Sequence, residues 1–361
     1  MTEKMKVALV ETGKSHDECL YAQLKILKSV DGISVVLICN ERLRKNVEIF
    51  DLVDEFIYLT VRENFCQWAD MFRLRRKLIH GGFDLVVINT AQGSMVKKLL
   101  LLPYPRHMKM LGILHNIQKI NEGSVSQQLI TRRLDGYYLL SDYLLQYLDS
   151  CKIGKTPVET FYPIFYPAFK PADVKKDPEE IWICIPGQVE RKRRDYDTLL
   201  EVLKCKKVNE NIRFIFLGPC EHSHGDGQYI KEKIAEAGLQ NQCLLWDGFV
   251  DNDVFHRVIS ESDYIMTLIH PNHVSWSLYE GQITGAYNLA IGYRKPMLLE
   301  NDFMSYEDFK DNAVFYSIGK LSETINSLKK PMNDQYYTDE KWSFGYQQQK
   351  YMSLINCVMG S

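Results

Sequence analysis

The sequence predicts an α/β protein made of two doubly wound, Rossmann-like domains that face a cleft. Short apolar runs of strand length alternate with segments of helical spacing along most of the chain. One charged segment, Lys170–Glu180, interrupts this alternation near the middle. The length of 361 residues exceeds what one hydrophobic core usually organises. Continuous apolar strands separated by helices are typical of parallel sheets that are covered on both faces.

The first half contains the elements of a predicted N-terminal domain over residues 1–168. The predicted strands are Val7–Val10, Ser34–Cys39, Phe56–Leu59, Leu85–Asn89, Met110–Leu114 and Gly136–Leu140. The segments between them that have helical spacing include Glu18–Lys28, Trp68–Ile79 and Met95–Leu102. In open α/β sheets, ligands bind beyond the carboxyl ends of the strands, so the loops after these strands are the first candidates for a site.

The second half repeats the pattern after a predicted linker over residues 169–180, which is rich in charge and contains two prolines. The predicted strands are Trp182–Ile185, Phe214–Leu217, Cys243–Trp246, Tyr264–Leu268, Met297–Leu299 and Val314–Tyr316. The predicted helices are Tyr196–Lys204, Tyr229–Ala237, Asn252–Ser260, Ala286–Tyr293 and Leu321–Leu328. The C-terminal domain spans 181–335. The tail, 336–361, is expected to form a helix over Asp339–Val358 that packs back on the N-terminal domain.

Composition narrows the class of protein. Apolar residues make up 45% of the chain, charged residues 25%, and the net charge is −2, so nothing indicates nucleic acid as a partner. The nine cysteines are widely spaced and form no Cys-x-x-Cys pair, which favours reduced thiols and a cytoplasmic protein. No apolar run has the length of a signal-peptide core or a membrane span, so any membrane contact is expected to be peripheral, on the inner face.

Two helix starts in the second half are suited to binding an anion. The loop after Trp182–Ile185 carries four consecutive cations, Arg191–Arg194, and leads into a helix for which Asp195 is a plausible N-cap. Cations are disfavoured at a helix N-terminus, and four of them make sense if an anion lies among them. The second start is Glu280–Gly285, which leads into Ala286–Tyr293. Together they predict a diphosphate held between two helix starts, although a solvated basic loop and an ordinary N-cap are the alternatives.

The order of motifs in the second half resembles the donor-binding domain of GT-B glycosyltransferases, most of all family 4. That family has a strand ending in Gly-Arg, a later basic residue, a strand ending in Gly, a Gly-x-Val turn, and two Glu residues before a helix that ends in Lys-Pro. The matching positions here are Gly187, Arg193, Gly218, Gly248-Phe249-Val250, Glu280 and Lys295-Pro296. Two positions depart from the pattern, because Gln188 replaces the arginine and Asn288 the second Glu.

The resemblance implies a role for each matching residue. Arg193, with Lys192 beside it, would bind the diphosphate, and Glu280 would bind hydroxyls of the donor sugar or ribose. Thr284 and Gly285 would offer backbone N–H groups to phosphate, and Asn288 would still hydrogen-bond a hydroxyl. Gly187, Gln188, Gly218, Phe249 and Val250 complete the expected donor site.

The first half resembles GT-B enzymes only in outline. His115 follows a predicted strand at a place where family members often carry a histidine near the sugar, and its alternative reading is an ordinary loop residue. Gly13 lies in the turn after the first strand and would allow the backbone to approach a phosphate. Several helical segments carry cations interleaved with Leu and Tyr, which suits either a membrane surface or solvated helix faces. These cations are Arg73, Arg75, Arg76, Lys77, Lys97, Lys98, Arg106, Lys109, Arg132 and Arg133.

No metal or other cofactor is expected. The segment Cys220–Asp226 contains metal-ligating residue types, but their i, i+2, i+4, i+6 spacing is that of a local loop rather than of a closed site. The same holds for His270 and His273. Such a domain would act by binding the diphosphate, neutralising its charge as it leaves and orienting the acceptor.

The predicted function is transfer of a sugar, by a hexosyltransferase, from a nucleotide-diphosphate sugar to a hydroxyl acceptor such as a lipid-linked glycan. Resemblance to family 4 implies retention of anomeric configuration and a role in cell-surface polysaccharide or glycoconjugate synthesis. One alternative is a non-catalytic relative that binds or scaffolds an active glycosyltransferase, which Gln188 and Asn288 would explain. Another is a different enzyme acting on the same class of ligand, such as a nucleotide-sugar epimerase.

Overall fold

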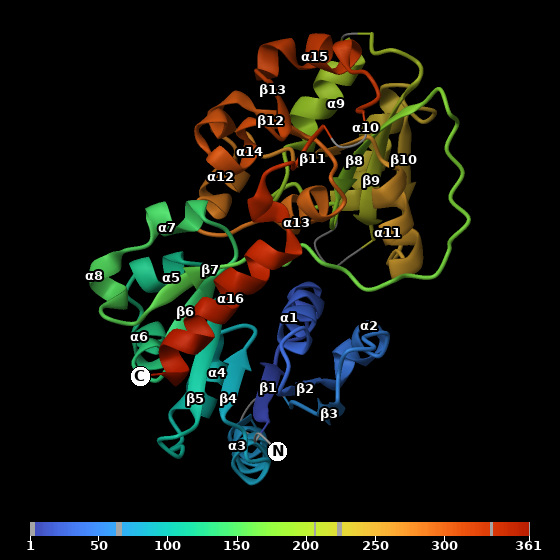
Figure 1. Cartoon of the computed structure of the whole chain (residues 1–361). Coiled ribbons are helices and arrows are strands. Elements are labelled where there is room, and N and C mark those ends of the chain that lie inside the picture. The colour runs from blue at the N-terminus through green and yellow to red at the C-terminus, as the bar shows by residue number, and fades with distance from the viewer. Residues whose placement is uncertain (1–3, 63–66, 206, 222–225, 333–334, 361) are drawn as a thin grey trace. The chain divides into compact units, whose positions relative to one another are not determined.

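The computed structural model describes residues 4–62, 67–205, 207–221, 226–332 and 335–360 (Figure 1). The chain divides into two compact units. Unit 1 consists of Met1–Pro167, Gly281–Ile283 and Glu340–Ser361, and unit 2 consists of Ala168–Glu280 and Thr284–Asp339. The predicted linker therefore lies within unit 2, where Lys176 Nζ forms an ion pair of 2.6 Å with Asp263.

Unit 1 is built on a parallel sheet of seven strands in the order β3-β2-β1-β4-β5-β6-β7. The strands are β1 Met5–Glu11, β2 Ile33–Asn40, β3 Glu55–Leu59, β4 Leu85–Ile88, β5 Lys109–Leu114, β6 Gly136–Leu139 and β7 Val158–Thr160. The first six agree with the predicted strands to within two residues at either end. The sequence analysis missed β7 because three residues are too few to show a periodic pattern.

The helices of unit 1 cover this sheet (Figure 1). They are α1 Leu20–Lys28, α2 Arg44–Val47, α3 Gln67–His80, α4 Gly93–Leu100, α5 Gln118–Asn121, α6 Val125–Thr131, α7 Tyr143–Tyr147 and α8 Ser150–Ile153, together with α16 Phe344–Met359. The predicted start of α1 at Glu18 is wrong, because Asp17–Cys19 form a 3-10 turn before the helix. The strands and α1 bury a continuous apolar core between them.

Unit 2 has a parallel sheet of six strands in the order β10-β9-β8-β11-β12-β13. The strands are β8 Ile181–Pro186, β9 Ile212–Pro219, β10 Cys243–Trp246, β11 Tyr264–Met266, β12 Met297–Glu300 and β13 Ala313–Tyr316. All six were predicted. However, β11 ends two residues earlier than expected, because Leu268 adopts a φ of 52°, which extended backbone cannot accommodate.

The helices of unit 2 are α9 Tyr196–Cys205, α10 Asp226–Glu236, α11 Asn252–Glu261, α12 Val274–Tyr279, α13 Gly285–Gly292, α14 Glu307–Lys310 and α15 Leu321–Ser327. The sequence analysis missed α12 and α14, which are short. In both units the first strand lies in the middle of the sheet and the strand order reverses beside it, as in the Rossmann fold. The predicted class of two doubly wound domains is therefore confirmed.

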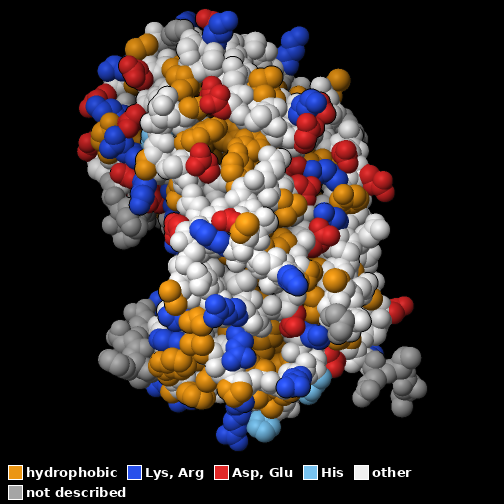
Figure 2. Space-filling view, turned by 90° about the vertical axis from the view of Figure 1, so that its left-hand side faces the viewer, with side chains coloured by type: hydrophobic (Ala, Val, Ile, Leu, Met, Phe, Trp, Pro, Cys, Tyr) orange, Lys and Arg blue, Asp and Glu red, His pale blue; other side chains and the backbone are white. Residues whose placement is uncertain are grey.

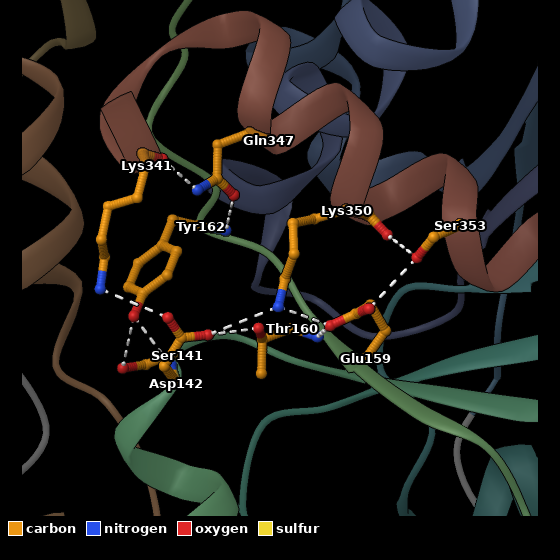
Figure 3. Close-up of polar contacts among 9 residues, drawn as sticks. All are labelled: Ser141, Asp142, Glu159, Thr160, Tyr162, Lys341, Gln347, Lys350 and Ser353. Carbon is orange, nitrogen blue, oxygen red and sulfur yellow. Dashed lines mark hydrogen bonds and ion pairs between the residues drawn. The ribbon is translucent and has the colours of Figure 1, made fainter. Parts of the chain in front are cut away.

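The C-terminal helix α16 belongs to unit 1, as predicted. It begins at Phe344 rather than at Asp339, because the Ser343 side chain accepts a hydrogen bond from the N–H of Tyr346 and caps it. Figure 3 shows its polar contacts with the end of the unit 1 sheet. Gln347 Oε1 accepts from the N–H of Tyr162 at 2.8 Å, and Lys350 Nζ lies 2.7 Å from a Glu159 carboxylate oxygen. No helix in the described ranges is both long and apolar enough to span a bilayer.

Candidate donor-binding site

The site in unit 2 lies where the strand order reverses, between the carboxyl ends of β8 and β11. In doubly wound sheets the loops on the two sides of this point diverge and leave a crevice for a ligand. The loop after β8 contains the predicted cations and leads into α9. A backbone hydrogen bond of 2.8 Å from Asp195 N to Leu268 O joins it to the loop after β11.

Two glycines allow the loops after β8 and β9 to pack closely. Gly187 has a φ of +105°, which side-chain-bearing residues rarely adopt. A Cβ on Gly218 would lie within 3.0 Å of the carbonyl group of Gly187, which is closer than real Cβ atoms come to other atoms. Both glycines are thus required by the backbone geometry of these two loops.

Replacing Gly218 with alanine is expected to lower the free energy of unfolding by about 1–3 kcal/mol, because the backbone of Gly187 must move away from the added methyl group. Urea unfolding followed by circular dichroism would measure the change. The matched control is Gly248→Ala, where an added Cβ would meet nothing within 4 Å. Equal stabilities of the two variants would show that the contact between the loops is not tight.

The four consecutive cations have different environments, contrary to the expectation that all surround an anion. Arg191 forms an ion pair of 2.6 Å with Asp197, and its guanidinium lies 4.3 Å from the centre of the Tyr229 ring. Arg194 is buried and donates to the backbone carbonyls of Pro186 and Gln188. Arg194 therefore holds the loop in shape from inside and is not available to a ligand.

Arg193 and Lys192 remain on the surface of this loop. Arg193 Nε lies 2.7 Å from a carboxylate oxygen of Glu190, which is largely buried, and the Tyr279 side chain lies close enough to interact with the guanidinium electrostatically. A half-exposed guanidinium at the strand-order reversal can bind a phosphate in a bidentate manner once the ligand competes with Glu190.

Tyr279 connects Arg193 to a small pocket on unit 2. Its lining residues are Ile269, Trp276, Tyr279, Glu280, Phe303 and Tyr306. Aromatic rings beside a carboxylate can cover the apolar face of a sugar and bind its hydroxyls. The sequence analysis named Glu280 as a candidate but none of the aromatic residues. Trp276 and Tyr279, three positions apart on α12, were the available signal for an aromatic face next to Glu280.

The other predicted residues of this site are placed as follows. Thr284 caps α13, with its Oγ1 accepting from the N–H of Ala286 at 3.4 Å, so its side chain serves the helix. Gly285 is the first helical residue, and Asn288 is buried one turn later. In the loop after β10, Phe249 is 76% exposed and Val250 is buried. Phe249 is thus accessible to a ligand, whereas Val250 packs inside.

A buried chain of hydrogen bonds lies beneath the loop after β8. Asp195 Oδ2 is 2.8 Å from His270 Nδ1, and His270 Nε2 is 2.8 Å from the hydroxyl of Tyr316. Burial raises the pKa of Asp195, but hydrogen bonds from His270 and Thr198 outweigh it and hold this pKa at about 2. The carboxylate also caps α9 through the N–H of Thr198. Asp195 therefore fixes the start of the helix, as predicted, and His270 fixes Asp195.

A second polar cluster lies at the carboxyl ends of β1, β4 and β5 in unit 1. Glu11 is buried and accepts hydrogen bonds from the Gly13 N–H at 2.5 Å, Asn89 Nδ2 at 2.7 Å and Thr90 Oγ1 at 2.6 Å. Burial raises the pKa of the Glu11 carboxyl group, although these donors oppose the shift. The N–H of Gly13 is thus used by Glu11, which differs from the expectation that it faces a phosphate.

His115 belongs to this cluster. Its Nε2 lies 2.7 Å from the carbonyl oxygen of Asn89, so Nε2 is the protonated nitrogen and donates. The ring centre lies 4.0 Å from that of His16, which adopts a φ of 71°. Burial, and then the nearby charge of His16, lower the pKa of His115 to about 3. His115 is therefore a neutral hydrogen-bonding group at neutral pH.

The lowered pKa of His115 predicts a dependence of stability on pH. In the unfolded chain the pKa of His115 is near 6.5, so below that pH the unfolded state binds a proton that the folded state does not bind. The stabilisation from neutral His115 is fully present above about pH 6.5 and is lost as the pH falls toward about 3. Between about pH 6.5 and 5, the free energy of unfolding of wild type is expected to fall by up to about 2 kcal/mol more than that of His115→Gln. Urea unfolding at both pH values measures this difference, and parallel losses in the two proteins would contradict it.

The candidate metal motifs carry no support from geometry. Within the described ranges, no three His, Cys, Asp or Glu side chains are arranged to hold an ion. His270 is bound to Asp195 and Tyr316, and His273 caps α12 by accepting from the N–H of Ser275. Residues 222–225 of the Cys220–Asp226 segment lie outside the described residues.

These two sheets and the returning helix are the GT-B fold, which the resemblance in the second half predicted. No protein-family model matches the sequence, and no curated protein matches it. Solved structures match over the full length. The Anabaena protein HepE in complex with UDP-glucose is 14% identical, with a TM-score of 0.64 over 99% of this chain and 98% of that one.

Two further structures show the range of proteins with this fold. A glycosyltransferase from Rickettsia africae is 12% identical, with a TM-score of 0.63 over 99% of both chains. The UDP-GlcNAc 2-epimerase from Neisseria meningitidis, bound to UDP-GlcNAc, is 12% identical, with a TM-score of 0.61 over 97% of this chain and 99% of that one. At these low sequence identities, the similarity establishes a shared fold and not a shared activity.

Proposed function

We propose that this protein is a hexosyltransferase that transfers a sugar from a nucleotide-diphosphate sugar to a hydroxyl acceptor. The observation that carries the proposal is the position of Arg193. It lies at the strand-order reversal of unit 2, close enough to Tyr279 for the two side chains to interact electrostatically, and Trp276 and Glu280 line the same pocket as Tyr279. A diphosphate at Arg193 and a sugar in the aromatic pocket would be adjacent. Solved proteins of this fold are described with UDP or UDP-glucose.

The chemistry would need no metal. Departure of the nucleoside diphosphate develops negative charge on its phosphate oxygens, and Arg193, Lys192 and the N–H groups at the start of α13 would stabilise that charge. Glu280 would orient the sugar through its hydroxyls. We further propose retention of configuration, an acceptor that includes lipid-linked glycans, a role in cell-surface polysaccharide or glycoconjugate synthesis, and action in the cytoplasm at the inner face of the membrane.

A thermal-shift screen over nucleotides and nucleotide sugars tests the donor class. A ligand at about 100 times its dissociation constant stabilises a protein by about 2.7 kcal/mol, which raises the melting temperature visibly. We expect a nucleoside diphosphate to shift melting and the matching nucleoside monophosphate to do so less, because the second phosphate contacts Arg193. Absence of any shift at millimolar nucleotide would overturn the proposal.

An epimerase is the second candidate, because 2-epimerases share the fold at similar TM-scores. Incubation of the stabilising nucleotide sugar without an acceptor separates the candidates. Conversion into an isomeric nucleotide sugar identifies an epimerase, and slow release of free sugar identifies a transferase using water as acceptor. Firm binding with neither product favours a non-catalytic partner of an active enzyme, which would be consistent with Gln188 and Asn288.

A further inference from the structure

Unit 1 carries a concentrated positive charge on α3, α4 and the chain that follows α4. Residues 67–109 contain eight Lys and Arg residues and two Asp residues, which gives a net charge of 8 − 2 = +6. The whole chain has a net charge of −2, so the remaining residues carry −2 − 6 = −8. In the fold, α3 packs against α4 and α4 packs against α6, so this charge is spread over adjoining helices. We call this surface the α3–α4 face.

The two acidic residues of this segment do not neutralise the face. Asp70 is buried and lies 2.8 Å from Arg62 and 3.1 Å from Arg73. Asp84 accepts from the N–H of Lys6 at 2.7 Å. Among the eight cations, only Arg73 forms an ion pair with a residue that the structure describes. The other seven are Arg75, Arg76, Lys77, Lys97, Lys98, Arg106 and Lys109.

Large apolar side chains project from the same face. Trp68 and Phe72 lie one turn apart on α3, are 40% and 53% exposed, and have ring centres 6.4 Å apart. Leu101, at the end of α4, is 39% exposed. Lys98 Nζ lies 6.0 Å from the centre of the Trp68 ring. Figure 2 shows hydrophobic and Lys/Arg side chains intermixed at the bottom of the view, with few acidic side chains among them.

We infer that the α3–α4 face docks on an anionic lipid bilayer. Protruding aromatic side chains among long cations are what the interface of a bilayer accepts, because the rings enter between head groups while Lys and Arg reach the phosphates. A bilayer contacts one face of a protein only. A long polyanion such as RNA would also meet the rest of the chain, whose charge of −8 repels it. The charge complementarity therefore favours a membrane surface.

Co-sedimentation of the full chain with lipid vesicles tests this inference. We expect binding to equimolar phosphatidylcholine and phosphatidylglycerol vesicles, little binding to phosphatidylcholine alone, and weakening with added salt. Each cation near such a surface contributes about fivefold in affinity. The affinity for anionic vesicles should therefore fall more than about tenfold in the triple variant Arg76→Gln, Lys98→Gln, Arg106→Gln. It should also fall in the double variant Trp68→Ser, Phe72→Ser.

Matched controls keep the test specific. The first control is a triple variant that removes three exposed cations from unit 2, Lys320→Gln, Lys329→Gln, Lys330→Gln. The second is a double variant that removes two exposed apolar side chains there, Ile318→Ser, Met332→Ser. Neither control should change sedimentation.

Insertion of Trp68 into the bilayer gives a second test, because brominated lipids should quench tryptophan fluorescence in wild type more than in Trp68→Phe. The inference is overturned if wild type does not sediment with anionic vesicles, or if the control variants lose as much vesicle binding as the variants of the α3–α4 face. It is also overturned if these cations bind heparin but not vesicles. Because UDP binding is measured separately, such a failure leaves the proposed donor site unaffected.

Discussion

Arg193→Ala is expected to weaken UDP binding by about 10- to 100-fold. A hydrogen bond to a charged group contributes about 1.5–3 kcal/mol, and each 1.4 kcal/mol is a factor of ten in affinity. Arg193 has the right position for such a bond, because its side chain is 48% exposed and lies near Tyr279, which lines the aromatic pocket. Isothermal titration calorimetry with UDP would measure the loss.

Arg191→Ala is the matched control for this experiment. Arg191 is also ion-paired to one carboxylate, is 43% exposed, and lies two positions away, but it faces Asp197 and Tyr229. Its replacement should change UDP binding by less than about threefold, as for an exposed ion pair. Equal losses in the two variants would show that only the general charge of the loop matters.

A reciprocal variant tests how Arg193 is held before a ligand arrives. Glu190 accepts from Arg193 at 2.7 Å and would compete with a phosphate for the guanidinium. Glu190→Gln is therefore expected to tighten UDP binding by a few-fold, because it removes a negative charge beside the phosphate while keeping the shape of the side chain. Weaker UDP binding by Glu190→Gln in the same titration would show that Glu190 orients Arg193 more than it competes.

Tyr351→Ala is expected to lower the free energy of unfolding of unit 1 by about 3–5 kcal/mol, the range for removing a fully buried large aromatic side chain. Tyr351 lies on α16 and is 0% exposed. Its ring stacks on that of Tyr138 with centres 4.3 Å apart, and its hydroxyl donates to Gln23 Oε1 at 3.1 Å. The C-terminal helix is thus part of the core of the N-terminal sheet. Urea unfolding followed by circular dichroism would measure the loss.

Two further variants separate the ring from its hydroxyl and from helix propensity. Tyr351→Phe keeps the ring and should cost only about 1 kcal/mol, the net value of one hydrogen bond. Gln349→Ala changes an exposed position on the same helix and should have almost no effect. If Tyr351→Ala were as mild as Gln349→Ala, α16 would not be docked on unit 1 in solution.

The candidate site shows how far sequence reasoning extends. Gly187 and Gly218 were predicted as site residues from their order along the chain, and the structure shows that two loops come into close contact at these glycines. The run Arg191–Arg194 looked uniform in sequence, yet Arg194 points inward to backbone carbonyls and Arg191 pairs with Asp197. A run of like charges specifies net charge but not the direction of each side chain, which depends on partners elsewhere in the fold.

The sequence by itself determined the alternation of strands and helices, the division into two doubly wound sheets and the presence of a C-terminal helix. Apolar periodicity and turn residues are local properties, so they can be read along the chain. Only the tertiary structure decided which side chains meet. Three arrangements join residues from separate elements: the hydrogen bonds that link Asp195, His270 and Tyr316, the ring contact of His115 with His16, and the pocket around Trp276 and Glu280. The reason is physical: parallel strands bring distant loops to one edge of a sheet, and their packing there selects partners that no local pattern records.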